Sequence, residues 1–325
     1  MRINQLIQLI LVTVILWPMS SMANGQTPEM LAHWDYDKTA PLGIKEIGVE
    51  KRGDVTIHDF TYASPKGGVV PAYLVVPKGK GPFAAVVWGH WYMGRSPMRN
   101  RKEFLDEAIA LAPAGVVSLL TDGPIARPDY VADNQPFSEK QVSYLVQQVI
   151  DMRRGVDLLS QRKDVDLKRL AYVGHSYNGV VGAILSGIDK RFKAFVLMTS
   201  TTSDEVTRKI PEYQEYRKQI GVEKFEAFEK KYYWTDQGRY IALAAPATVF
   251  LQYARQEPFL DPKWVPLYVE VVSEPKRFKL YDAPHSLNAE ARRDRIAFLV
   301  EQLKLKSVPE AVIMKVPELV QPPKQ

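Results

Sequence analysis

A short segment in the middle of the chain, Gly174-His175-Ser176-Tyr177-Asn178-Gly179, sets a serine between an apolar run and a helix-like run. Small residues around such a serine let the strand and the helix approach closely, and the turn projects the hydroxyl above the sheet. The N-terminus of the following helix favours negative charge there. The segment therefore predicts Ser176 as a nucleophile, although the usual spacing is G-x-S-x-G and Asn178 takes the second small position.

A serine nucleophile needs a general base, and the chain has 5 histidines. His285 lies in a loop between the last strand-like run and the last helix-like run, where a base can reach over the carboxyl edge of a sheet. His175 is adjacent to Ser176, so its side chain is expected to point away from the serine. We therefore predict His285 as the base.

The base needs a carboxylate that fixes its tautomer and stabilises the imidazolium. Glu257 follows the end of the penultimate strand-like run and precedes a proline. Asp261 is an alternative, but it also suits the N-cap of the next helix. Asp282 lies close in sequence to His285, which makes it the weakest choice. The order Ser176, Glu257, His285 is the one expected for a nucleophile elbow of this kind.

An oxyanion also needs donors, and one should be the backbone N–H of Tyr177, directly after the nucleophile. The second should come from the loop 89–94, through the backbone of Trp91 or Tyr92. We expect His90 to order this loop by hydrogen bonding. The aromatic side chains expected to contact a substrate are those of Trp91, Tyr92 and Tyr240.

The surrounding elements can position these residues at one sheet edge. Residues 55–62 and 69–76 flank a turn and predict an antiparallel hairpin. Apolar runs then alternate with helix-like runs, which predicts right-handed βαβ units and a doubly wound, mostly parallel α/β sheet of about eight strands. We expect strands over 83–88, 115–121, 170–174, 192–198, 247–253 and 277–281, and helices over 102–111, 139–160, 177–186, 262–272 and 287–305.

Other segments define the domain organisation. Residues 1–23 combine a positive start, an apolar stretch and Ser21-Met22-Ala23, which predicts a signal peptide cleaved after Ala23 and a periplasmic or secreted protein without a membrane span. Residues 24–305 are expected to form one domain, with a charged, tyrosine-rich insertion at 201–245 as a lid. Residues 24–48 read as an irregular arm. The tail 306–325 contains several prolines and is expected either to be flexible or to lie across the domain.

The composition excludes several classes of protein. The chain contains no cysteine, which rules out a cysteine nucleophile, disulfides and thiolate metal sites. The formal net charge of +6 arises from 43 Lys and Arg against 37 Asp and Glu, without a long basic block. We therefore expect no nucleic-acid partner. The predicted chemistry requires no cofactor and no metal.

The chain resembles the α/β-hydrolase superfamily, in the branch of dienelactone-hydrolase-like and acetyl-xylan-esterase-like proteins. The resemblance covers most of residues 50–305 and rests on the Ser176 segment, on Ala254-Arg255-Gln256-Glu257-Pro258, on Ala283-Pro284-His285 and on His90. Trp91 stands where many members have glycine, which makes Tyr92 the donor if the register holds. Dienelactone hydrolases proper use a cysteine, so the resemblance implies a serine esterase.

The resulting hypothesis is a serine hydrolase that cleaves a small-molecule or carbohydrate-linked carboxylic ester through an acyl-enzyme intermediate. One alternative is a small-substrate peptidase or amidase of prolyl-oligopeptidase type. Those proteins generally carry a large β-propeller, for which this chain has no room. The other alternative is a catalytically silent, hydrolase-like binding protein, which only Asn178 and Trp91 favour.

Overall fold

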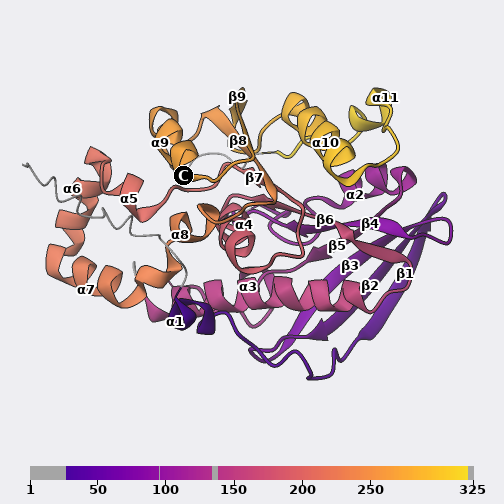
Figure 1. Cartoon of the computed structure of the whole chain (residues 1–325), viewed down its shortest axis with the longest axis horizontal. Helices are drawn as coiled ribbons and strands as arrows, with labels where there is room; N and C mark the ends of the chain where they lie inside the picture. Colours follow the sequence, from indigo (N-terminus) through magenta and orange to yellow (C-terminus); the bar gives the residue numbers. More distant parts are fainter. Residues whose placement is uncertain (1–26, 95, 134–137, 321–325) are drawn as a thin grey trace, which may run out of the picture.

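The structure, a computed structural model, describes residues 27–94, 96–133 and 138–320. Its centre is a nine-stranded sheet in the order β1-β2-β3-β5-β4-β6-β7-β8-β9 (Figure 1). The first strands pair antiparallel, and from β5 to β9 all neighbours pair parallel. The strands are β1 (Lys45–Arg52), β2 (Val55–Ala63), β3 (Val69–Pro77), β4 (Phe83–Gly89), β5 (Val116–Thr121), β6 (Val165–His175), β7 (Ala194–Met198), β8 (Thr248–Gln256) and β9 (Lys276–Pro284).

Helices cover both faces of this sheet, and each face has its own apolar core. One core packs α3 (Glu139–Ser160), α4 (Tyr177–Ile188), α8 (Gly238–Ile241) and α9 (Val265–Val271) against the sheet. The other packs α2 (Leu105–Leu111), α10 (Ala289–Leu303) and α11 (Glu310–Ile313). The central strands β4, β5 and β7 are almost wholly buried, as expected for strands covered on both faces. The predicted doubly wound fold is confirmed.

The main departure from the predicted elements lies before the hairpin. Residues 24–48, expected to be irregular, contain α1 (Pro28–Ala32) and the start of β1. Every residue of β1 is exposed, so no alternation of buried and exposed side chains marks it in the sequence. With β1 at its edge, the sheet has nine strands instead of about eight.

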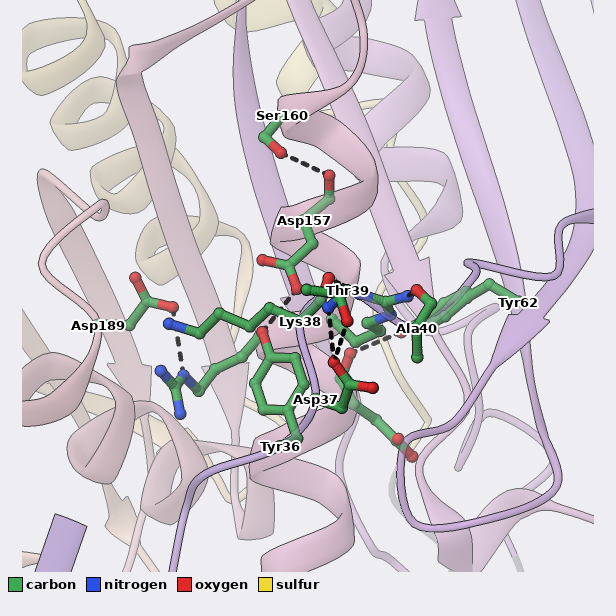
Figure 2. A network of polar contacts seen from close by, with 12 residues as sticks. Tyr36, Asp37, Lys38, Thr39, Ala40, Tyr62, Asp157, Ser160 and Asp189 are labelled. Atoms are coloured by element: carbon green, nitrogen blue, oxygen red, sulfur yellow. Dashed lines mark hydrogen bonds and ion pairs between the residues drawn. The ribbon is translucent and has the colours of Figure 1, made fainter. Parts of the chain in front are cut away.

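The segment 33–42, which follows α1, is fastened to α3 by a network of polar contacts (Figure 2). The Tyr36 hydroxyl donates to Asp157 Oδ2 at 2.7 Å. Arg153 Nη1 donates to the Trp34 carbonyl at 2.6 Å, and Arg154 donates to the Ala40 carbonyl. The indole of Trp34 is fully buried. The predicted arm is therefore packed on the domain.

Two further segments cover the ends of the domain. The insertion after β7 forms α5 (Asp204–Thr207), α6 (Pro211–Ile220) and α7 (Val222–Tyr232), which gather at one end of the molecule (Figure 1). The described part of the tail, residues 306–320, lies across the domain, because Arg292 of α10 donates to the carbonyls of Val316 at 2.6 Å and Pro317 at 2.8 Å. The predicted signal peptide, residues 1–23, lies outside the described residues. Within the described part of the chain, no helix is long and apolar enough to cross a bilayer.

Candidate active site

Ser176 occupies a strained turn between β6 and α4. Its φ and ψ of 55° and −115° lie in a region that non-glycine residues rarely adopt. A Cβ at Gly174 would come within 2.1 Å of the Asn178 carbonyl oxygen, so glycine is required where strand and helix approach. The Ser176 N–H donates to the Met198 carbonyl of β7 at 2.8 Å, which fixes the turn. Ser176 is only half-buried, and its side chain is therefore within reach of a ligand.

Asn178, which replaces the usual small residue, fits because other groups receive its side chain. Gly89 at the end of β4 leaves the space, since a Cβ there would come within 2.6 Å of Asn178 Cβ. Asn178 Nδ2 donates to the His90 carbonyl at 2.5 Å, and Asn178 Oδ1 accepts from Gln148 Nε2 at 3.1 Å. The departure from the usual spacing thus ties the turn at Ser176 to the loop after β4.

His285 follows β9 and is held by a carboxylate from the loop after β8. Its Nδ1 donates to Glu257, at 2.9 Å from Oε1 and 2.8 Å from Oε2. The two side chains are 2% and 3% exposed, so this contact is shielded from water. Asp261 instead caps η4 (Pro262–Trp264) by accepting from the Lys263 N–H at 3.0 Å, and it is exposed. The structure therefore pairs His285 with Glu257.

This pairing defines the proton state of His285. Because Nδ1 donates to Glu257, the neutral ring carries its lone pair on Nε2. His285 Nε2 is buried and has no hydrogen-bond partner among the described residues. Burial lowers the pKa of His285, the Glu257 hydrogen bond raises it and nearby His175 lowers it, with a net fall below the usual 6.5. The imidazole is thus neutral and able to accept a proton at pH 7.

The loop after β4 is ordered by His90, as predicted. His90 Nδ1 donates to the Trp91 carbonyl at 2.8 Å, and His90 Nε2 accepts from the Gly123 N–H at 2.9 Å. The Trp91 N–H donates to Glu103 Oε2 at 2.5 Å, so it is not available to an oxyanion. No described residue accepts from the Tyr92 N–H. Of the two predicted donors in this loop, only Tyr92 remains.

Beneath the site lies a buried chain of contacts that the sequence reasoning missed. Glu103 Oε1 lies 2.6 Å from His175 Nδ1, and His175 Nε2 donates to the His285 carbonyl at 2.9 Å. The indole of Trp91 stacks on His175 with a centroid separation of 5.1 Å and lies parallel to His285 at 6.3 Å. Glu103 appears in the sequence only as one charge at the start of an expected helix, so no local signal marks it.

Of the three aromatic side chains expected to contact a substrate, those of Trp91 and Tyr240 are fully buried, and only that of Tyr92 is exposed. The ring of Phe259 meets His285 edge-on at 5.0 Å and is 65% exposed. The Tyr92 and Tyr130 hydroxyls lie 2.9 Å apart, and Tyr92 is 38% exposed. Tyr240 was expected to contact substrate, but it is fully buried and its hydroxyl bonds within the core, accepting from Trp34 Nε1 and donating to the Trp234 carbonyl. The structure therefore places Tyr240 away from the site.

Two other tyrosines of the insertion, Tyr213 and Tyr232, pack within it. The ring of Tyr213 packs against Phe225 at 5.5 Å, and Tyr232 packs against Phe228 at 4.7 Å. From the sequence, these tyrosines suit either an aromatic wall facing a substrate or a core within the lid, and the contacts favour the core. In the described ranges, no three Asp, Glu or His side chains are placed to hold a metal ion together.

Comparison with known proteins rests on structure alone. No protein-family model and no curated protein matches the sequence. The acetyl xylan esterase from Paenibacillus sp. R4 is similar with a TM-score of 0.67 and 18% identity, covering 85% of this chain and 95% of its own. Acetyl xylan esterase 1 from Thermoanaerobacterium sp. JW/SL YS485 is similar with a TM-score of 0.69 and 14% identity, over 86% and 95%. The glucuronoyl esterase from Solibacter usitatus gives 0.58 and 17%, over 85% and 91%.

The chain has the α/β-hydrolase fold. Ligand sites in open α/β sheets lie outside the carboxyl ends of the strands. In this α/β-hydrolase fold, Ser176 follows the end of β6, Glu257 the end of β8 and His285 the end of β9. The three predicted residues therefore lie at the carboxyl edge of the sheet, where open α/β sheets bind ligands.

Proposed function

We propose that the protein is a serine hydrolase that cleaves a carboxylic ester through an acyl-enzyme intermediate. The observation that carries the proposal is His285, which is held through Nδ1 by Glu257 and whose Nε2 has no partner among the described residues, at the same carboxyl edge of the sheet as the strained turn of Ser176. Acyl transfer requires a nucleophile, a base and an orienting acid, the roles that we assign to Ser176, His285 and Glu257. The similar structures include acetyl xylan esterases and a glucuronoyl esterase, which favours an ester over an amide as the substrate.

In the proposed reaction, Ser176 Oγ attacks the ester carbonyl while His285 Nε2 accepts the hydroxyl proton. Glu257 stabilises the imidazolium that forms. The negative charge on the carbonyl oxygen is received by the N–H groups of Tyr177 and Tyr92. Tyr177 is the first residue of α4, where backbone N–H groups have no acceptor within the helix. His285 then returns its proton to the leaving alcohol, and water activated by the same base releases the acid.

The structure also bears on the alternative of a silent binding protein. Asn178 was one of its two supports, yet Asn178 joins the turn at Ser176 to the loop that carries Tyr92. Trp91 was the other, and its ring stacks beside the two histidines of the site. Both departures from the usual pattern thus support an ordered site.

The substrate and the setting are further parts of the proposal. The exposed ring of Phe259, which contacts His285, and the exposed ring of Tyr92 favour an ester with a ring-bearing group, such as a carbohydrate-linked ester. Residues 201–245 are proposed to form a lid over the site, because they follow β7, the strand next to β6, and Ser176 comes directly after β6. Export to the periplasm or the medium rests on the pattern of residues 1–23.

A fluorophosphonate probe tests the nucleophile. The full chain should be labelled and should hydrolyse p-nitrophenyl acetate, whereas Ser176→Ala should lose labelling and at least about 10⁴-fold in kcat. Ser160→Ala, which removes an exposed hydroxyl at the end of α3, should behave like the wild type. Labelling that survives Ser176→Ala would contradict the proposal. Faster hydrolysis of p-nitroacetanilide than of p-nitrophenyl acetate would favour the amidase alternative.

A further inference from the structure

The buried contacts beneath the site connect segments that are far apart in the chain. Glu103 comes from the turn before α2, His175 from the end of β6, Trp91 from the loop after β4 and His285 from the loop after β9. The side chains of Glu103 and His175 are both 0% exposed. Neither side chain reaches a substrate, and the proposed reaction does not use either of them.

We propose that Glu103 and His175 form a positioning pair that holds the oxyanion loop and the catalytic histidine in register with each other. Glu103 accepts a hydrogen bond from the N–H of Trp91, the residue before the proposed donor Tyr92. His175 Nε2 donates a hydrogen bond to the backbone carbonyl of His285 itself. A displacement of the oxyanion loop is therefore transmitted to His285 through the contact between Glu103 and His175, and a displacement of His285 is transmitted to the loop in the same way. This inference rests on the proposed function, because it assigns these residues a role in the same reaction.

The hydrogen bonds specify how protons are arranged in the pair. Glu103 Oε2 accepts from the Trp91 N–H and His175 Nε2 donates to the His285 carbonyl, so the remaining contact needs one proton between Glu103 Oε1 and His175 Nδ1. Burial raises the pKa of Glu103 to about 8 and lowers that of His175 to about 4. A neutral Glu103 that donates to a neutral His175 satisfies every group. Thr199 Oγ1 also donates to the His285 carbonyl, at 3.2 Å.

Loss of the Glu103 proton breaks this arrangement. His175 must then carry its proton on Nδ1 to bond the carboxylate, which leaves a lone pair on Nε2 facing the His285 carbonyl. The titratable and charged groups that face Glu103 are His90, His175, His285 and Arg295. Burial lowers the pKa of each of these histidines, so all are neutral from pH 7 to 9, and the Arg295 guanidinium stays charged. Glu103 is the group in this set that changes its charge over that range.

Two substitutions separate positioning from simple packing. The amide of Glu103→Gln can accept from the Trp91 N–H and donate to His175, so it reproduces the protonated acid, whereas Glu103→Leu keeps similar volume and can do neither. We expect kcat for p-nitrophenyl acetate within about threefold of the wild type for Glu103→Gln. For Glu103→Leu we expect a fall of about 10- to 100-fold with little change in KM, as for a misplaced catalytic group. Asp189→Leu is the matched control, because it removes a buried carboxylate at the far end of α4.

The pH profile adds a readout that a merely structural role would not change. The wild-type kcat should fall above about pH 8, and Glu103→Gln should abolish that fall. If Glu103→Leu does not fold, this comparison still decides the matter. A folded Glu103→Leu with wild-type kcat, or a Glu103→Gln variant that keeps the alkaline fall, would overturn the proposal.

A third readout does not depend on turnover. The proton on His285 Nδ1 that is shared with Glu257 should give a downfield ¹H NMR resonance, which Glu103→Leu shifts or broadens and Glu103→Gln preserves. An unchanged resonance in Glu103→Leu refutes the positioning pair. The proposed function alone would be refuted by two results together. The wild-type protein would show the resonance, and Glu103→Leu would shift it, but the wild-type protein would neither hydrolyse esters nor be labelled by fluorophosphonate.

Discussion

Replacing Glu257 by glutamine tests the electrostatic core of the proposed site. The substitution keeps the volume of the side chain and an oxygen that can accept from His285 Nδ1, but it removes the negative charge. The charge matters only when His285 becomes an imidazolium, which occurs as Ser176 attacks the substrate. The expected loss is therefore in kcat, with little change in KM.

The size of the loss follows from the geometry. Unit charges 2.8 Å apart, the distance from His285 Nδ1 to Glu257 Oε2, attract by about 6 kcal/mol at an effective dielectric constant of about 20. Solvent screens this attraction only weakly, because the side chains of His285 and Glu257 are 2% and 3% exposed. Each factor of ten in rate corresponds to about 1.4 kcal/mol. Since glutamine keeps one hydrogen bond, we expect kcat to fall by about 10³- to 10⁴-fold.

The assay is the pH profile of p-nitrophenyl acetate hydrolysis. Activity requires neutral His285, so the wild-type rate should be lost as the pH falls through a pKa below 6.5. Glu257 raises that pKa, and its removal should move the acid limb to still lower pH. Asp261→Asn is the control, because asparagine also caps η4 and should keep kcat within about twofold. The reasoning fails if Glu257→Gln keeps more than a tenth of kcat, if its acid limb moves to higher pH, or if Asp261→Asn loses more.

Two other substitutions test the supports of the site. Asn178→Ala removes the hydrogen-bond partner of Gln148 Nε2 and of the His90 carbonyl, so the free energy of unfolding in urea should fall by about 1–3 kcal/mol. The kcat should fall by about tenfold as the loop after β4 loosens. An unchanged kcat would contradict the link between this loop and the turn at Ser176. Arg292→Ala releases the carbonyls of Val316 and Pro317, so limited proteolysis should cut the tail faster while kcat stays unchanged; equal cleavage rates would show that other contacts hold the tail.

Much of the fold could be predicted because its signals are local. Helix α3 was predicted with the observed bounds, because an amphipathic pattern runs through residues 139–160. The buried strands are apolar runs, which neighbouring residues alone define. β1 was missed for the same reason, because an edge strand with every residue exposed carries no such pattern.

The sequence by itself determined the type of nucleophile and the order of the candidate groups. Ser176, Glu257 and His285 could be named because each follows a strand, and the carboxyl ends of parallel strands meet at one edge. The absence of cysteine leaves serine as the candidate nucleophile of this turn.

Only the tertiary structure decided which group each side chain meets. His285 bonds Glu257, whereas Asp261 caps the next turn. The Trp91 N–H donates to one carboxyl oxygen of Glu103. The other oxygen of Glu103 contacts His175, which lies 72 positions after Glu103 in the chain. Such partners depend on atoms brought within 3 Å from distant segments, and neither spacing nor periodicity in the sequence encodes those distances. Tertiary packing therefore paired His285 with Glu257, left Tyr92 as the candidate donor in its loop and brought Glu103 against His175.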